Sequence, residues 1–200
     1  MTVETRRYEK KRRAELEAET RRQITEAAVA LHGSVGPART SISAIAERAG
    51  VRRSTVYRHF PDEPALFAAC STHWEEQNPA PDVAGWTEIE DPDERLRTAL
   101  DELYGFYSRT ESMLENLYRD ERTMPTVRER FTRFHGYLAA ARDMLLVGHA
   151  ARGRRRDELR AALGHALTFS TWRSLTRGQG LDDSHAAELM RELVAGVARR

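Results

Sequence analysis

The chain of 200 residues has one cysteine and no long apolar run, and each of these two shortages excludes a class of protein. Cys70 has no second cysteine to pair with, so an internal disulfide is excluded. In the apolar sequence L-F-A-A-C we interpret it as a buried small hydrophobic residue rather than a redox sensor. No stretch of 18 apolar residues is present, so we expect no transmembrane span. The N-terminus lacks the apolar segment of a secretory signal, so we expect a cytoplasmic protein.

The sequence motifs of the common enzyme classes are also missing. There is no Gly-rich phosphate loop, nucleophile elbow or cysteine metal cluster, and the carboxylates form no recognisable catalytic pair. His135, His149, His165 and His185 have no i,i+4 partner among them, so we expect neither a metal site nor a cofactor. An enzyme is therefore only a distant alternative.

The charge is nearly balanced overall but divides unevenly along the chain, whose formal net charge is +1. Residues 1–60 hold 13 Lys and Arg against 7 Asp and Glu, a net of +6. Residues 61–200 hold 19 against 24, a net of −5. A basic end on an acidic remainder indicates that the N-terminal part faces a polyanion such as DNA.

Residues 40–60 contain two short helical patterns joined at Gly50. Apolar residues of the first recur at spacings of three and four, which predicts one buried face; they are Ile42, Ile45, Ala46 and Ala49. The second pattern begins near Arg52 and buries Val56 and Phe60. Such a pair is either a plain helical hairpin with a solvated polar face or a helix-turn-helix whose second helix enters a DNA major groove.

The residues of this stretch favour the second interpretation. The segments I-A-E-R-A-G-V and S-T-V-Y-R-H-F, followed by an acid and a leucine-led helix at residues 62–66, resemble the N-terminal pattern of the TetR family of repressors over residues 18–78. The resemblance implies an all-α protein of about nine helices. It would comprise a basic arm at 1–17, a three-helix helix-turn-helix DNA-binding domain at 18–78, and a C-terminal ligand-binding and dimerisation domain at 79–200.

Matched residue by residue, the family pattern implies a set of DNA contacts. The residues expected to face base edges are Arg53, Ser54 and Tyr57. The residues expected to contact phosphates are Thr40, Thr55 and His59, with Arg52 and Arg58 as additions. Arg52 stands where the family often has a capping Ser or Thr. Glu63 stands where a lysine often contacts phosphate, so that contact is in doubt.

Residues 1–13 are rich in Arg and Lys and almost free of apolar residues, which leaves several interpretations open. The segment could be a disordered tail, or a basic arm that lies along phosphates or enters a minor groove. It could also extend the first helix backwards through the i,i+4 pairs Glu9–Arg13 and Glu17–Arg21. We hypothesise that a basic arm compensates for Glu63.

The periodicity predicts further helices at about 15–32, 62–77, 92–109, 113–118, 127–145, 157–176 and 183–197. Asp62 and Asp91 are predicted N-caps. The intervening residues 78–92 are Pro-rich and aperiodic, which predicts a loop.

The resemblance also implies an effector site and a homodimer. Aromatic residues on several C-terminal helices suit a small-molecule pocket, although many of them will be core; the candidates are Tyr107, Tyr118, Phe134, His135 and Trp172. The last two helices are expected to pair with their copies; the residues expected nearest the two-fold axis are Leu163, Leu189, Leu193 and Val197. The predicted function is a repressor released from a pseudo-palindromic operator by a small molecule. The alternative is a DNA-binding protein whose C-terminal domain docks a protein partner.

Overall fold

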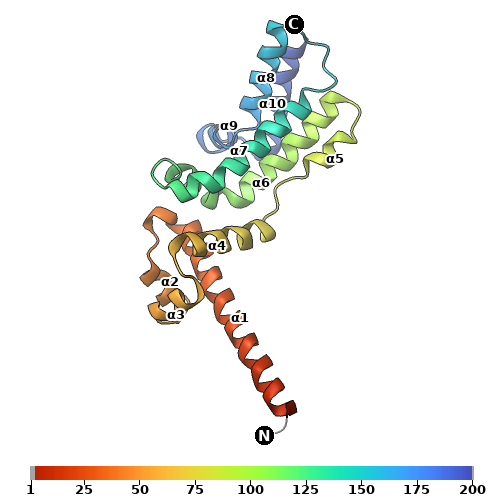
Figure 1. The fold of residues 1–200 in the computed structure, drawn as a ribbon. Helices are drawn as coiled ribbons and strands as arrows, with labels where there is room; N and C mark the ends of the chain where they lie inside the picture. Colours follow the sequence, from red (N-terminus) through yellow and green to blue (C-terminus); the bar gives the residue numbers. More distant parts are fainter. Residues whose placement is uncertain (1–2, 200) are drawn as a thin grey trace. The chain divides into compact units, whose positions relative to one another are not determined.

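A computed structural model describes residues 3–199, with side chains from residue 7 onward. Residues 1–2 of the predicted basic arm and Arg200 lie outside the described part. Within it the regular elements are ten α-helices, one short 3-10 helix and one π-helix, so the all-α prediction is confirmed (Figure 1). The chain divides into two compact units. Unit 1 contains Met1–Gln77 and Glu115–Val127, and unit 2 contains Asn78–Leu114 and Arg128–Arg200. The predicted domain boundaries remain a prediction.

Unit 1 is built on a long first helix. Its elements are α1 (Val3–Ser34), η1 (Pro37–Arg39), α2 (Ile42–Arg48), α3 (Arg53–His59), α4 (Glu63–Gln77) and the end of α6 (Pro92–Asp120). Helix α1 packs against both α2 and α4, and α2 packs against α3. The core they enclose includes Ile24, Ile45, Val56 and Phe60, all at most 3% exposed. Burial of these side chains stabilises the unit by about 1.5–3 kcal/mol each.

Helix α1 begins at Val3, well before the predicted start near residue 15. Two i,i+4 ion pairs run along its exposed first half, Lys11–Glu15 and Arg13–Glu17. Such pairs add a few tenths of a kcal/mol each. The strong helix formers Glu, Lys, Arg and Ala dominate this segment. The backward extension of the first helix is therefore confirmed over the described residues, but the ion pairs along it are these two and not the expected Glu9–Arg13 and Glu17–Arg21.

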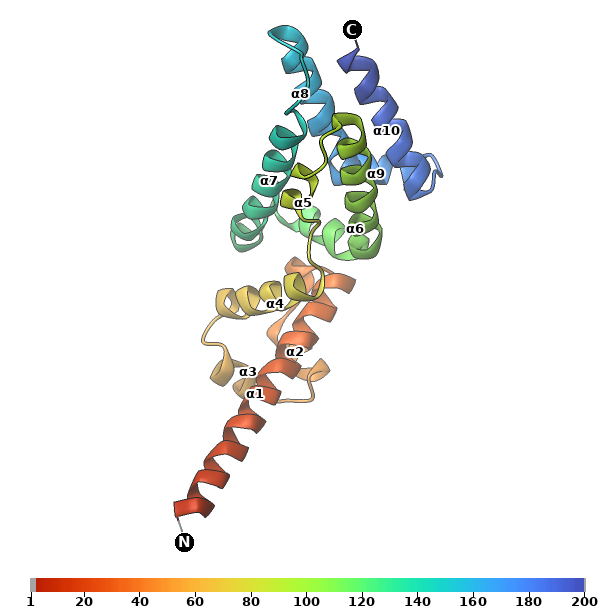
Figure 2. The same ribbon diagram turned by 90° about the vertical axis from the view of Figure 1, so that its right-hand side faces the viewer.

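Unit 2 is a helical bundle. It contains α5 (Val83–Thr87), most of α6, most of α7 (Pro125–Leu145), α8 (Arg154–Ala166), α9 (Phe169–Arg173), η2 (Ser174–Gly178) and α10 (Asp183–Ala198) (Figure 2). Helices α8 and α10 pack along each other. None of the helices in residues 3–199 combines the length and hydropathy that a membrane crossing requires.

Two predicted boundaries in this region are wrong. The helices expected at 92–109 and 113–118 are one continuous helix, α6, because the residues between them contain neither Gly nor Pro. The one β-branched residue there, Thr110, is buried and donates its hydroxyl to the Phe106 carbonyl at 2.6 Å. The predicted loop 78–92 contains α5, which Asp82 caps by accepting the Ala84 N–H at 2.9 Å. Trp86 is buried and ties α5 to α6 by donating to Glu102 at 2.7 Å.

The helix predicted at 157–176 is broken after α8. Thr168 restarts the chain as the N-cap of α9, its hydroxyl accepting the Thr171 N–H at 3.3 Å. A break leaves carbonyl groups without helical partners. Two buried tyrosines of α6 satisfy them: Tyr104 donates to the Ala166 carbonyl at 2.9 Å and Tyr107 to the Leu167 carbonyl at 2.6 Å. The break therefore depends on partners about 60 residues away.

Candidate nucleic-acid interface

Helices α2 and α3 and the turn between them have the geometry of a helix-turn-helix. The Ser41 hydroxyl caps α2 by accepting the Ala44 N–H at 3.2 Å. Gly50 has φ +67°, the left-handed conformation that glycine adopts without strain. The turn is closed by the Val51 N–H, which donates to the Ala46 carbonyl at 2.9 Å. The predicted turn at Gly50 is therefore confirmed.

Helix α3 divides into a buried face and an exposed face. Val56 within it and Phe60 at its end are each 1% exposed and hold the helix on the core of unit 1. Arg52 precedes the helix without a side-chain capping bond, as expected for a residue that lacks an acceptor oxygen. The exposed side chains are Arg52, Arg53, Ser54, Tyr57 and Arg58. The residues predicted to read base edges therefore share one solvent-facing surface.

The residues predicted to contact phosphates are less exposed. Thr40 and Thr55 are half-buried, and the Thr40 hydroxyl donates to the Gly36 carbonyl at 2.8 Å. His59 is half-buried as well, and its Nε2 is buried with no partner among the described residues. Burial lowers the pKa of His59, and the nearby charges of Arg58 and Arg21 lower it further. A phosphate could therefore meet only the Nδ1 edge of this ring.

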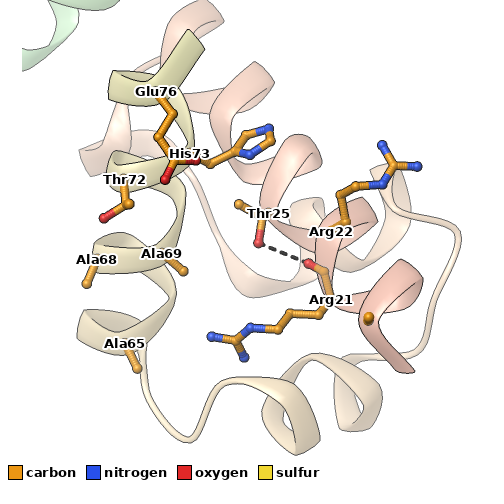
Figure 3. Close-up of a pocket in the computed structure, with 10 residues that line it drawn as sticks. Arg21, Arg22, Thr25, Ala65, Ala68, Ala69, Thr72, His73 and Glu76 are labelled. Atoms are coloured by element: carbon orange, nitrogen blue, oxygen red, sulfur yellow. Dashed lines mark hydrogen bonds between the residues drawn. The ribbon is translucent and has the colours of Figure 1, made fainter. Parts of the chain in front are cut away.

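The C-terminal end of α3 is held by Arg21 of α1. The Arg21 guanidinium donates to the His59 carbonyl and lies 4.0 Å from the centre of the Phe60 ring. Figure 3 shows this side chain extending from α1 across an open groove between α1 and α4. The groove has a volume of about 600 Å³ and an alanine-rich floor; its lining is Ala18, Arg21, Arg22, Thr25, Ala65, Ala68, Ala69, Thr72, His73 and Glu76. Arg21 thus fixes the angle of α3 against α1.

The other end of α1 is held by the last turn of α6, which sequence reasoning missed. The Asn116 amide donates to the His32 and Gly33 carbonyls at 2.9 Å each. Arg119 donates to the Val35 carbonyl at 2.9 Å. These bonds satisfy acceptors that the end of a helix leaves free. Asn116 is 7% exposed, so its amide also requires these partners.

The close contact between the last turn of α6 and the end of α1 requires a residue without a side chain at position 36. A Cβ added at Gly36 would lie 2.0 Å from the Arg119 guanidinium and 2.6 Å from the Asp120 carboxylate. Its φ of +93° also lies in the left-handed region. The end of α1 near residue 32 was predicted from the sequence, but the close approach of α6 to Gly36 was not.

His32 lies buried beside this contact, 7% exposed. Its Nδ1 is 3.4 Å from the Cys70 sulfur, and its ring is 5.6 Å from that of Phe67. Burial lowers the pKa of His32 to about 4, although the Asp120 charge opposes this. The ring is therefore neutral at physiological pH. Cys70 is 1% exposed, as predicted.

The predicted effector residues do not form one site in the structure. Tyr107 and Trp172 are fully buried with rings 6.0 Å apart, and Trp172 donates to Asp183 at 2.8 Å. Tyr118 is half-buried in unit 1, where burial and the Glu121 charge raise its pKa. Phe134 and His135 lie on α7, half-buried and exposed respectively. Tyr107 and Trp172 thus have the environment of core residues.

Phe134 lies in a row of aromatic rings on α7, and the carboxylates of Glu102 and Asp82 lie close enough to Tyr137 to affect its pKa. We call Phe131, Phe134, Tyr137, Glu102 and Asp82 the aromatic and acidic patch, of which only Phe134 was predicted. Phe134 stacks between Phe131 and Tyr137, with ring centres 5.4 Å and 5.9 Å away. Tyr137 is half-buried and donates to the Pro81 carbonyl at 2.9 Å. Burial, together with the charges of Glu102 and Asp82, raises the pKa of Tyr137. The i,i+3 spacing of residues 131, 134 and 137 is the signal that could have revealed it.

The predicted dimer residues fall into two groups. Leu189 and Leu193 on α10 are 37% and 55% exposed, and Val197 is half-buried. Leu163 is fully buried inside the chain itself, on helix α8, which packs against α10. It has no surface left to offer a second copy, so the expectation that it lies near the two-fold axis is not retained.

Comparison with known proteins agrees with this geometry. Residues 24–70, which span α2, α3 and the parts of α1 and α4 that support them, match the family described as "Bacterial regulatory proteins, tetR family". A search of curated protein sequences finds no match.

Solved structures share the fold over most of the chain. A TetR-like regulator from Rhodococcus sp. RHA1 is 22% identical, with a TM-score of 0.66 over 90% of this chain and 97% of that one. A putative TetR-family regulator from Mesorhizobium loti is 18% identical, with a TM-score of 0.64 over 92% and 96%. A putative regulator from Saccharomonospora viridis, in complex with choline, is 20% identical, with a TM-score of 0.61 over 89% and 96%. The chain therefore shares the fold of TetR-like regulators, and its residues 24–70, which contain the helix-turn-helix, match the tetR family of bacterial regulatory proteins.

Proposed function

We propose that this regulator is a cytoplasmic repressor that binds a pseudo-palindromic operator as a homodimer and is released from it by a small molecule. The observation that carries the proposal is the exposed face of α3. Arg53, Ser54 and Tyr57 lie together on it, while Arg21 and the buried Val56 hold the helix in place. A rigid helix with an exposed polar face suits insertion into a major groove.

The side chains of this face suit different parts of a base pair. Arg53 can donate two bonds to a guanine edge, the Ser54 hydroxyl can bond to either base type, and the Tyr57 ring can pack on a thymine methyl. The proposed phosphate contacts are Thr40, Arg52, Thr55, Arg58 and the Nδ1 edge of His59. These would fix the position of the protein on DNA without reading its sequence.

The proposed dimer interface lies on α10. Leu189 and Leu193 expose large apolar side chains within two turns of one helix, and Val197 continues the same line. A two-fold axis beside this face would give both copies the same interface and would place two α3 helices on matching half-sites.

The proposed effector site is the aromatic and acidic patch around Phe134, with His135 at its edge. Stacked aromatic faces beside the carboxylates of Glu102 and Asp82 favour an organic cation, which aromatic rings attract and which carboxylates neutralise. The Saccharomonospora viridis structure, which has the same fold and contains choline, supports this ligand class. Tyr107, Tyr118 and Trp172 would act only indirectly, by supporting the surrounding helices.

Release requires that the ligand favour a conformation with low DNA affinity. Helix α6 is a physical route for this coupling. It carries Glu102 and Phe106 in unit 2 and runs without interruption to Asn116 and Asp120 in unit 1. A shift of α6 would therefore act on the end of α1, and through α1 on the Arg21 contact with α3.

The DNA part of the proposal is tested by selecting duplexes from a random-sequence library and measuring their affinity by fluorescence anisotropy. We expect a two-fold symmetric site. Arg53→Ala should weaken binding to it by about 1–3 kcal/mol and blur the preference at one base pair. Arg58→Ala should weaken selected and random duplexes to the same extent. Equal losses on both duplexes for Arg53→Ala would refute its role in reading bases.

The effector part is tested with choline and its uncharged isostere 3,3-dimethyl-1-butanol. Choline should release the selected duplex, whereas the isostere should not, because only the cation is attracted by rings and carboxylates. Glu102→Gln should weaken the response, and Glu94→Gln, an exposed residue of the same helix paired with Arg97, should leave it unchanged. Equal potency of the two compounds would refute a cation site.

A further inference from the structure

We propose that the exposed first part of α1, residues 7–18, is a rigid basic helix that lies across the phosphates of the duplex flanking the operator. The proposal rests on the proposed DNA-binding function and adds a second contact surface to it. We call this segment the α1 extension. All of its residues are exposed, including Tyr8 at 66% and Leu16 at 60%, so it has no apolar face packed on unit 1. Figures 1 and 2 both show α1 running on beyond α2 and α3.

The positive side chains of the α1 extension can be assigned to different faces of the helix. With about 100° between successive residues, Lys10 lies within about 20° of Arg21 around the helix, and Arg7 within about 40°. Arg21 is the residue that contacts the end of α3. Arg7 and Lys10 therefore continue the same side of α1 toward the N-terminus. Glu17 also lies on this side, but it is paired with Arg13 at 3.2 Å. Arg12 lies about 180° away from Arg21, on the opposite face.

The helical conformation decides which part of a duplex this segment can meet. An α-helix with side chains is about 10–12 Å wide, whereas the minor groove is about 6 Å wide. The α1 extension therefore cannot enter a minor groove as an extended arm would. Its length, about 18 Å at about 1.5 Å per residue, corresponds to roughly five base pairs. The partner that fits this surface is the phosphate backbone of flanking DNA, recognised by charge and not by sequence.

Binding to phosphates predicts a specific dependence on salt and on duplex length. The slope of log K against log salt becomes shallower by about one for each phosphate that the protein no longer neutralises. The probes are two duplexes with the same selected site, one with flanks of two base pairs and one with flanks of ten. The wild-type chain should bind the longer duplex more tightly and with a steeper salt slope.

The matched variants are Arg7→Gln, Lys10→Gln and Arg12→Gln, each of which removes one exposed positive charge and keeps a good helix former. Arg7→Gln and Lys10→Gln should each reduce the preference for the longer duplex and lower its salt slope by about one per bound chain. Arg12→Gln, on the opposite face, should change both much less. Equal effects of all three variants would mean that the segment attracts DNA by its total charge and not through one face, which would overturn the proposal.

A second variant separates a rigid helix from a flexible charged tail. Ala14→Pro interrupts the helix while keeping every charge. Because the proposal requires a rigid helix, the Ala14→Pro variant should lose the preference for the longer duplex. Circular dichroism would check that the rest of the chain stays helical. An unchanged preference would overturn the rigid-helix proposal. If wild type selects no duplex at all, the proposed DNA-binding function itself fails, and this inference fails with it.

Discussion

The buried carboxylate of Asp120 accepts a hydrogen bond from the backbone N–H of Ala38 at 2.9 Å, although 82 residues separate the two. Ala38 belongs to η1, the short element that leads from α1 into α2. The last turn of α6, which holds the end of α1, therefore also holds the segment that leads into the helix-turn-helix. Arg119, which pairs with the Asp120 carboxylate at 2.7 Å, completes the contact.

Removing this carboxylate should loosen unit 1. Asp120→Ala leaves the Ala38 N–H and the Arg119 guanidinium without the buried carboxylate that accepts from both, which should lower the free energy of unfolding by about 1–3 kcal/mol. Urea unfolding measured by circular dichroism would detect this. The control is Asp143→Ala, which removes a surface carboxylate that is 51% exposed and paired with Arg142 and Arg160. Exposed pairs contribute little, so this change should stay below about 1 kcal/mol. Equal effects would mean that the buried contact contributes nothing beyond a surface charge.

Acid should destabilise the chain through His32. Its pKa is about 4 in the folded chain and about 6.5 in an unfolded one, so the unfolded state binds more protons between these values. The free energy of unfolding should therefore fall as the pH drops from about 6.5 to about 4, by about 3 kcal/mol. Below pH 4 both states are protonated, and this contribution no longer changes.

The measurement is urea unfolding at a series of pH values between 7 and 4. His32→Phe removes the titrating group and keeps an aromatic ring in the core, so its stability should depend less on pH than that of wild type. His185→Gln removes an exposed histidine and should leave the wild-type dependence unchanged. Parallel curves for wild type and His32→Phe would show that other groups cause the acid sensitivity.

The break between α8 and α9 should depend on the Tyr107 hydroxyl. Tyr107→Phe keeps the ring but leaves the buried Leu167 carbonyl without its donor, which should destabilise unit 2 by about 1–3 kcal/mol. Tyr8→Phe makes the same chemical change at a side chain that is 66% exposed and should be neutral. Thermal unfolding of the two variants provides the comparison, and equal melting temperatures would contradict a structural role for this hydroxyl.

The dimer depends on α10 in the proposed arrangement. Leu193→Asp would place two carboxylates in the apolar interface, because two-fold symmetry repeats each substitution. Light scattering at micromolar concentration should report a dimer of 22.8 kDa chains for wild type and a monomer for the variant. Val147→Asp, at a position with similar exposure, 60% against 55%, should stay dimeric. A monomeric wild type would remove the basis for two matched half-sites.

The local features of unit 1 could be predicted because neighbouring residues determine them. The N-cap Asp62 accepts the Ala65 N–H, Gly50 takes its left-handed turn, and the alternation of buried Val56 with exposed Tyr57 follows from helical periodicity. The family resemblance rested on the same short-range pattern. These features need only a few successive residues, so the sequence by itself determined them.

Contacts between distant segments were decided only by the tertiary structure. The bond from Asn116 to the end of α1, the tyrosines that satisfy the broken end of α8, and the burial of Leu163 each join residues that lie far apart in the chain. Helical periodicity shows that apolar residues share one face of a helix. It does not show whether that face packs against the same chain or against another copy. Where a helix can either continue or break, the outcome depends on whether a distant donor is present to satisfy the freed carbonyl groups.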